Sequence, residues 1–161
     1  MSYNAPDIIG KVDGAVVKDR VKIVSVYCST VTTVAAGVPI ALDPADTTYG
    51  LGKTFKVNVV DDNPLMAGIT VEAKTVTTGQ PVGKIKIQVE GPIQAADTYN
   101  PTAQGTINLG DAVGGNNSTT AKTIKAVGTC AASIQPFARA IKAYTSGQAD
   151  GALWLCNPLA L

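Results

Sequence analysis

Alternation of hydrophobic and polar positions is the strongest signal in this chain, and it occurs in short segments. Over residues 84–90, Ile85, Ile87 and Val89 alternate with polar residues, the period of a half-buried β-strand. We therefore expect these three side chains to be buried and Lys84, Lys86, Gln88 and Glu90 to point the other way. Further strand-like segments are 12–17, 21–27, 30–34, 38–42, 54–60, 106–110, 123–132, 138–144 and 153–156.

These segments are separated by turn residues, and none carries a convincing helical stripe. The pattern predicts an all-β fold, a small β-barrel or β-sandwich of short antiparallel strands. Residues 21–27 have apolar side chains at positions of both parities, which predicts burial on both faces. Pro39 predicts that the strand at 38–42 lies at a sheet edge.

One pattern occurs twice, over residues 67–92 and 138–158. Each copy has an Ala-rich segment, a Gly-Gln-x-x-Gly turn and a strand that we expect to stop at a proline. We expect at least one of Gly79 and Gly83, and one of Gly147 and Gly151, to have a positive φ. The two copies are either related units or two ordinary hairpins that share turn chemistry, and both interpretations predict β-structure.

The length of 161 residues suits one domain with an arm. Residues 1–10 contain Pro6 and Gly10 and no clear periodicity, which predicts an N-terminal arm. Residues 11–161 then form a single β domain. Within it, about 92–120 is rich in Gly, Pro and Asn and is predicted to be a loop-rich insert with one strand, at 106–110, and a flexible tip at 114–118.

Composition excludes several classes of function. The chain has no histidine, so catalytic triads and metal sites that need imidazole are excluded. Charged residues make up 16% and the net charge is +1, with no concentration of basic residues such as a nucleic-acid binder carries. The polar start is not a signal peptide, and no apolar run approaches the roughly 20 residues of a membrane span.

The remaining chemical motifs are incomplete. Residues 61–63 resemble a fragment of a calcium loop without its spacing, and 50–54 resemble the end of a phosphate loop without its upstream glycine. Asp43 and Asp46 bracket a proline and are expected to cap a turn. We therefore expect no catalytic residue, no metal site and no cofactor, and the chain is not predicted to be an enzyme.

Cysteine and tryptophan also favour structural roles. Cys28, Cys130 and Cys156 are widely spaced and include no Cys-x-x-Cys, so we expect three small reduced core residues made in a reducing cytoplasm. Trp154 lies in an apolar strand and is expected in the core, with a carbohydrate platform as the alternative.

The repeat resembles the small β-barrel decoration (cement) proteins of tailed-bacteriophage heads. The residues that carry the resemblance are 68–73, Gly79 and 84–91, together with 14–17 followed by 21–24. The Ala, Thr, Gly and Val richness and the low charge fit as well. The resemblance covers mainly residues 10–91 and less clearly 123–158, and the insert at 92–120 departs from the minimal pattern.

The resemblance implies a structural virion protein that binds the outside of the capsid shell and stabilises it. Its implied partners are the major capsid protein and itself, as a homotrimer, with no nucleic acid and no membrane. It would be made in the host cytoplasm and located on the capsid surface. The capsid-contact candidates lie in the arm: Tyr3, Asn4, Pro6, Asp7, Ile8 and Ile9.

Two alternatives remain open at this point. The chain could be another virion component, such as a head-fibre base or a minor capsid or tail protein. It could instead be a carbohydrate-binding β-module centred on Trp154 and the tyrosines.

Overall fold

The computed structural model describes residues 21–28, 33–43, 45, 54–57, 66–75, 83–115, 123–129 and 136–156. In these ranges the regular structure is β, apart from one short 3₁₀ turn, η1 (Val127–Thr129). The predicted all-β class is confirmed. The strands are β1 (Lys22–Cys28), β2 (Thr33–Val34), β3 (Pro39–Leu42), β4 (Thr54–Val57), β5 (Met66–Thr70), β6 (Lys74–Thr75), β7 (Gly83–Ile93), β8 (Thr102–Ala103), β9 (Ala112–Gly115), β10 (Thr123–Ala126), β11 (Ala138–Lys142) and β12 (Ala152–Cys156).

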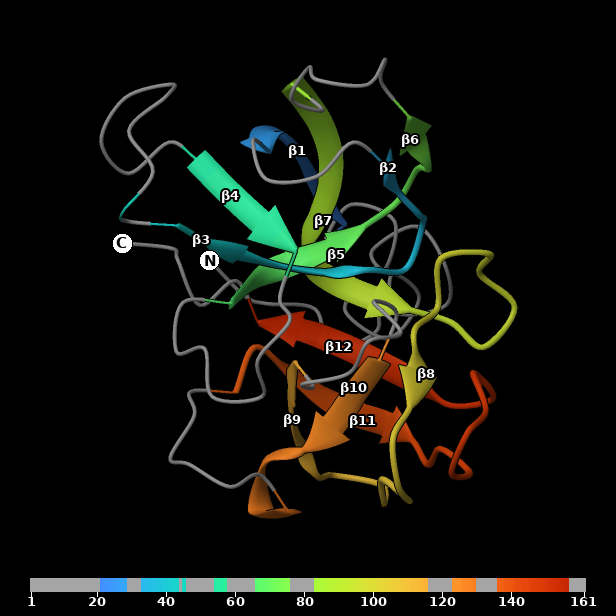
Figure 1. The fold of residues 1–161 in the computed structure, drawn as a ribbon. Coiled ribbons are helices and arrows are strands. Elements are labelled where there is room, and N and C mark those ends of the chain that lie inside the picture. The colour runs from blue at the N-terminus through green and yellow to red at the C-terminus, as the bar shows by residue number, and fades with distance from the viewer. Residues whose placement is uncertain are drawn as a thin grey trace, which may run out of the picture.

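Ten strands form one sheet in the order β1-β4-β3-β5-β7-β12-β11-β9-β10-β8, and β2 pairs with β6 separately (Figure 1). All pairings are antiparallel except β1–β4 and β10–β8. The ten-stranded sheet as a whole is open and is not a closed barrel, although the pairing of β1 with β7 joins β1, β4, β3, β5 and β7 in a ring. The 11 residues of β7 pair with β1 and β5 near its start and with β12 near its end, so the sheet continues past β7 towards β8.

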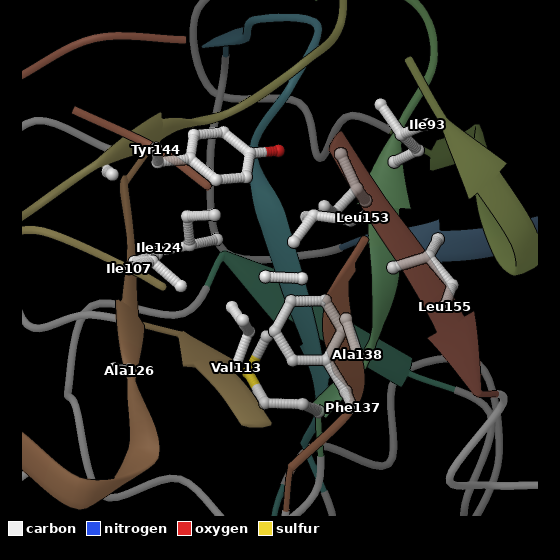
Figure 2. Packing of buried hydrophobic residues seen from close by; sticks show 14 of the residues in the cluster. Ile93, Ile107, Val113, Ile124, Ala126, Phe137, Ala138, Tyr144, Leu153 and Leu155 are labelled. Carbon is white, nitrogen blue, oxygen red and sulfur yellow. The ribbon is translucent and has the colours of Figure 1, made fainter. Parts of the chain in front are cut away.

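Two hydrophobic cores lie on either side of β3 and β5. We call one of them the upper core; it contains Val26, Val34, Val38, Ile40, Ala67, Ile85, Ile87 and Val89. The lower core is larger and is built around Phe137, Tyr144, Leu153 and Leu155 (Figure 2). All five residues of β5 are buried, with Met66 and Ile69 in the lower core and Ala67 in the upper one. β5 is thus a wall shared by both cores.

The alternation in β7 is confirmed for its apolar side. Ile85 and Ile87 are fully buried and Val89 is 6% exposed, while Lys84 and Lys86 are exposed. Glu90, expected to be exposed, is half-buried.

The end of β7 corrects the prediction, and Gln88 makes contacts that alternation does not predict. The Gln88 side chain is buried, because its Nε2 donates to the Pro92 carbonyl (2.9 Å) and its Oε1 accepts from the Tyr99 hydroxyl (3.1 Å). The strand also continues through Pro92 to Ile93, with Gly91 at φ 95°. A glycine in this left-handed conformation lets the chain bend without ending the strand.

Glycines at the repeated turn behave as predicted in part. Gly83 (φ 71°) and Gly147 (φ 79°) both have positive φ, so one glycine of each pair is confirmed; Gly79 lies outside the described residues. Gly151 has a different role, because a Cβ there would overlap the ring of Tyr144.

Two predictions about strand environment are wrong. β1 is buried on one face only: Val26 is buried, whereas Ile23 is 48% exposed and Ser25 is exposed. β3 is not an edge strand, since it pairs with both β4 and β5. Pro39 is tolerated because it is the first residue of the strand and its register partner is on β5, beyond the last β4 partner.

The predicted insert is more regular than expected over its described part, residues 92–115. Gly114 and Gly115, predicted as a flexible tip, lie in β9, where they are buried and pair with β10. The strand predicted at 106–110 is reduced to a single bridge between Ile107 and Tyr144. The strand predicted at 123–132 ends at Ala126. The predicted arm, residues 1–10, lies outside the described residues.

Candidate interaction surface

The outer face of β11 and β12 carries exposed side chains over a well-packed inner face. Ala138 and Ala140 of β11 are buried in the lower core, while Arg139 is exposed. On β12 the half-exposed Trp154 alternates with buried neighbours. Arg139 lies directly opposite Trp154 in the antiparallel pair, so the two side chains share one face.

A register irregularity changes which side chains reach this face. Ala140 pairs with Leu153 and Lys142 pairs with Ala152, which leaves Ile141 as an extra residue. Such a bulge redirects a side chain at the cost of one ladder position. Ile141 is 42% exposed on the same side as Arg139, and because of the bulge Lys142 is exposed beside it as well.

A tight turn presents the most exposed large hydrophobic residue of the described chain, Leu109, which is 71% exposed. The Asp111 N–H donates to the Asn108 carbonyl (3.1 Å), and Asp111 Oδ2 accepts from the Asn108 N–H (2.8 Å). Gly110 occupies the third position with φ 87°, a conformation that favours glycine. The turn is therefore closed by a backbone hydrogen bond and by a hydrogen bond to the Asp111 carboxylate.

This turn is fastened to β11. The Gly110 N–H donates to the Ala140 carbonyl (2.8 Å), and Arg139 Nη1 donates to the Gly110 carbonyl (3.0 Å). Leu109 consequently lies next to the bulge that carries Ile141. We call Leu109, Arg139, Ile141 and Trp154 the β11 patch.

A buried polar pair supports the loop that follows β11. The Tyr144 hydroxyl donates to Asn100 Oδ1 (2.7 Å), and Asn100 Nδ2 donates to the carbonyls of Ala149 (2.9 Å) and Gly151 (3.0 Å). Burial raises the pKa of Tyr144 far above its ordinary value, so the hydroxyl stays protonated and remains a donor. Figure 2 shows the Tyr144 ring among the side chains of the lower core.

Three carboxylates in this half of the molecule close turns. Asp97 Oδ2 accepts from the Gln94 N–H (2.7 Å), Asp111 acts as described above, and Asp150 Oδ1 accepts from the Thr145 N–H (2.9 Å). Hydrogen bonds from Thr145 lower the pKa of Asp150. These three aspartates accept hydrogen bonds from backbone N–H groups and so stabilise turns, which is a structural role for a carboxylate.

Backbone groups of β8, the last strand of the sheet, are also hydrogen-bonded. The Ala103 N–H donates to the Gln148 carbonyl and the Gly147 N–H donates to the Ala103 carbonyl, both at 2.9 Å. The outer edge of β8 is therefore covered by the 147–148 segment. Contacts with other molecules on this half must use side-chain faces rather than that edge.

The outer face of β1 and β7 is more polar. Lys84 lies over the Tyr27 ring, 5.3 Å from its centroid, and Lys86 is 3.8 Å from Glu72. Both partners of the ion pair are exposed, so the pair contributes little to stability. Ile23 is the exposed large hydrophobic on this face, and its neighbours are charged or polar.

The predicted capsid-contact residues are not among those described: Tyr3, Asn4, Pro6, Asp7, Ile8 and Ile9. The incomplete motifs at 50–54 and 61–63 lie largely or wholly outside the described residues as well. Asp43 is buried and its Oδ1 accepts from the Ala45 N–H (3.3 Å), a turn contact as expected. Cys156 corrects the core prediction because it is exposed.

Leu109 was missed by the sequence prediction, which placed it in a strand. The signal that could have found it is local: Asn108, Gly110 and Asp111 around one leucine form a turn signature. Such a turn points its second residue away from the backbone hydrogen bond.

The described residues contain no group of three or more Cys, Asp or Glu side chains placed to hold a metal ion. No helix in the described ranges is long and apolar enough to cross a membrane. Comparisons with models of known protein families and with curated proteins give no match for this chain.

Proposed function

We propose that the protein is a structural virion component, a head decoration (cement) protein that binds the outside of a capsid shell and stabilises it. The supporting observation is how its polar side chains are used. Asp97, Asp111 and Asp150 hold turns, Tyr144 and Asn100 hold a loop, and the exposed β11 patch is apolar with one arginine. Shape and contact surface, not reactive groups, are what this framework maintains.

The proposal also rests on the resemblance to decoration proteins that residues 68–91 carry. A decoration protein needs a stable frame that tolerates dense packing against neighbours, and a neutral chain with few charges has little electrostatic repulsion to overcome. The shell contact is assigned to the arm through Tyr3, Asn4, Pro6, Asp7, Ile8 and Ile9, with the major capsid protein as partner.

The test uses purified particles that lack the protein, to which full-length chain or a chain without residues 1–10 is added. Full-length protein should bind at hundreds of copies per particle, and the shortened chain should stay folded but not bind. Binding of a few copies would favour a head-fibre base or a minor capsid or tail protein instead. If neither chain binds, the proposed function is wrong.

One observation favours a second candidate, a carbohydrate-binding module. Trp154 is half-exposed on the outer face of β12 and lies opposite Arg139, and an exposed indole beside a hydrogen-bond donor can stack against a sugar ring. A glycan array with wild-type protein and Trp154→Ala separates the candidates. Binding that depends on Trp154 would replace the decoration proposal.

A further inference from the structure

We propose that the β11 patch is the surface through which one copy of this chain binds a second copy. The patch is formed by Leu109, Ile141, Arg139 and Trp154, and the partner it fits is another subunit of the same chain. The inference deepens the proposed function, on which it rests for the role of the assembled copies, by assigning the contact between subunits to one face.

The residues of the patch suit a protein contact. Tryptophan and arginine are enriched at the energetic centres of interfaces, and exposed aliphatic side chains beside them supply apolar area. Leu109 is 71% exposed and Ile141 is 42% exposed, and they lie on adjacent segments joined by the Gly110–Ala140 hydrogen bond.

The patch is already ordered before any partner arrives. Two hydrogen bonds between Asn108 and Asp111 close the turn under Leu109, and three more join it to Arg139 and Ala140 of β11. A surface fixed in this way loses little conformational entropy on binding. A solvent-exposed leucine on such a rigid turn contributes nothing to the core of its own subunit.

The charges around the patch favour a second copy as the occupant. Arg139 and Lys142 are basic, while Asp111, next to the Arg139-bonded Gly110, and Asp150 are acidic. Lys142 is close enough to Asp150 to help lower its pKa. A second copy carries the same mixture of two charges of each sign and so offers opposite charges to both, whereas a partner of one sign would meet repulsion from half of them.

Backbone pairing is not available as an alternative contact at β8. Gln148 and Gly147 already bond to Ala103, so a strand from another subunit cannot add there. On this half of the described chain, association has to use a side-chain face, and the β11 patch is where exposed large hydrophobic residues are adjacent.

The experiment measures self-association of the full chain by analytical ultracentrifugation from micromolar to millimolar concentration. The variants are Leu109→Asp and Ile141→Asp. The control is Ala95→Asp, because Ala95 is exposed and has the same second position in a turn, Gln94 to Asp97, closed by the same pair of hydrogen bonds. Far-UV circular dichroism verifies that each variant is folded.

We expect the wild type to associate and each patch variant to raise the dissociation constant by about tenfold or more, while Ala95→Asp leaves it unchanged. A wild type that stays monomeric over the whole range overturns the inference. So do patch variants that associate like the wild type, or a control that is weakened equally. If association behaves as expected but particles are not decorated, the proposed function fails and the inference stands.

Discussion

At the scale of single residues, the pair Asn100–Tyr144 shows why some polar groups lie inside an apolar core. Asn100 accepts a hydrogen bond from the hydroxyl of Tyr144 and donates to the carbonyls of Ala149 and Gly151, and both Tyr144 and Gly151 are buried. Leaving a buried group unsatisfied costs more than the net gain of the bond. Asn100 thus stabilises the loop between β11 and β12.

Replacing Asn100 by Ala should lower the free energy of unfolding by about 1–3 kcal/mol, because three hydrogen bonds end and two of the partner residues, Tyr144 and Gly151, stay buried. Tyr144→Phe is the matched control: it removes one hydroxyl and keeps the ring, so it should cost less, about 0.5–1.5 kcal/mol. Urea unfolding measures both. A Tyr144→Phe variant less stable than Asn100→Ala would contradict this order.

The lowered pKa of Asp150 predicts that the stability of the folded protein depends on pH. Hydrogen bonds from Thr145 lower its pKa in the folded protein below the unfolded value. The folded state therefore gains stability above the unfolded pKa, and this gain is lost as the pH falls through the folded pKa. Asp150→Asn should be less stable than wild type at neutral pH and equal to it in acid. Urea midpoints of both proteins along a pH series test this, and a constant difference would refute it.

At the scale of elements, β5 and β7 cross so closely at Gly68 that no side chain fits between them. A Cβ on Gly68 would overlap the carbonyl oxygen of Gln88, which belongs to the backbone and cannot rotate away. This contact lets β5 lie between the two cores while also pairing with β7.

Gly68→Ala should therefore destabilise the protein by about 1–3 kcal/mol through overpacking. Gly128 provides the control, because a Cβ there meets no atom within 4 Å and its φ is not positive. Gly128→Ala should change stability by less than about 0.5 kcal/mol. Thermal unfolding of both variants gives the comparison, and equal melting temperatures would show that the strands separate readily at Gly68.

The sequence pattern is sufficient to predict the strands that bury only one of their two faces. The buried side of β7 follows from alternation, and the positions of β1, β11 and β12 follow from their strand-like composition. The burial of Gln88 does not, because its partner Tyr99 is 11 residues away along the chain. β9 was missed because Gly114 and Gly115 have no side chain to show a pattern, although their backbones pair with β10.

The candidate surface was less predictable than the fold. Trp154 and Arg139 could be placed on strands from the sequence, but their pairing is set by the register of β11 on β12. The exposure of Ile141 follows the alternation of β11, but the exposure of Lys142 results from a bulge in that register, which no local pattern predicts. The contact candidates in the arm came from the family resemblance, and they remain predictions.

At the scale of the whole molecule, the shared wall formed by β3 and β5 should make the two cores unfold together. Ala67 and Ile40 contribute to the upper core, while their neighbours Met66 and Ala41 contribute to the lower one. Loss of either core exposes one side of the same strands, so neither half keeps its packing without the other. Cooperative loss of both is the behaviour expected of a single folding unit.

Ile87→Ala tests this coupling, since Ile87 is fully buried in the upper core while the chain's single tryptophan, Trp154, is on β12 in the lower half. The variant should lose about 2–5 kcal/mol. Because the halves are coupled, the urea midpoint seen by Trp154 fluorescence should fall by the same amount as the midpoint seen by far-UV circular dichroism. Leu153→Ala, in the lower core, should likewise shift both signals together. If Ile87→Ala moves the dichroism transition and leaves the fluorescence transition in place, the halves unfold independently and β5 does not couple them.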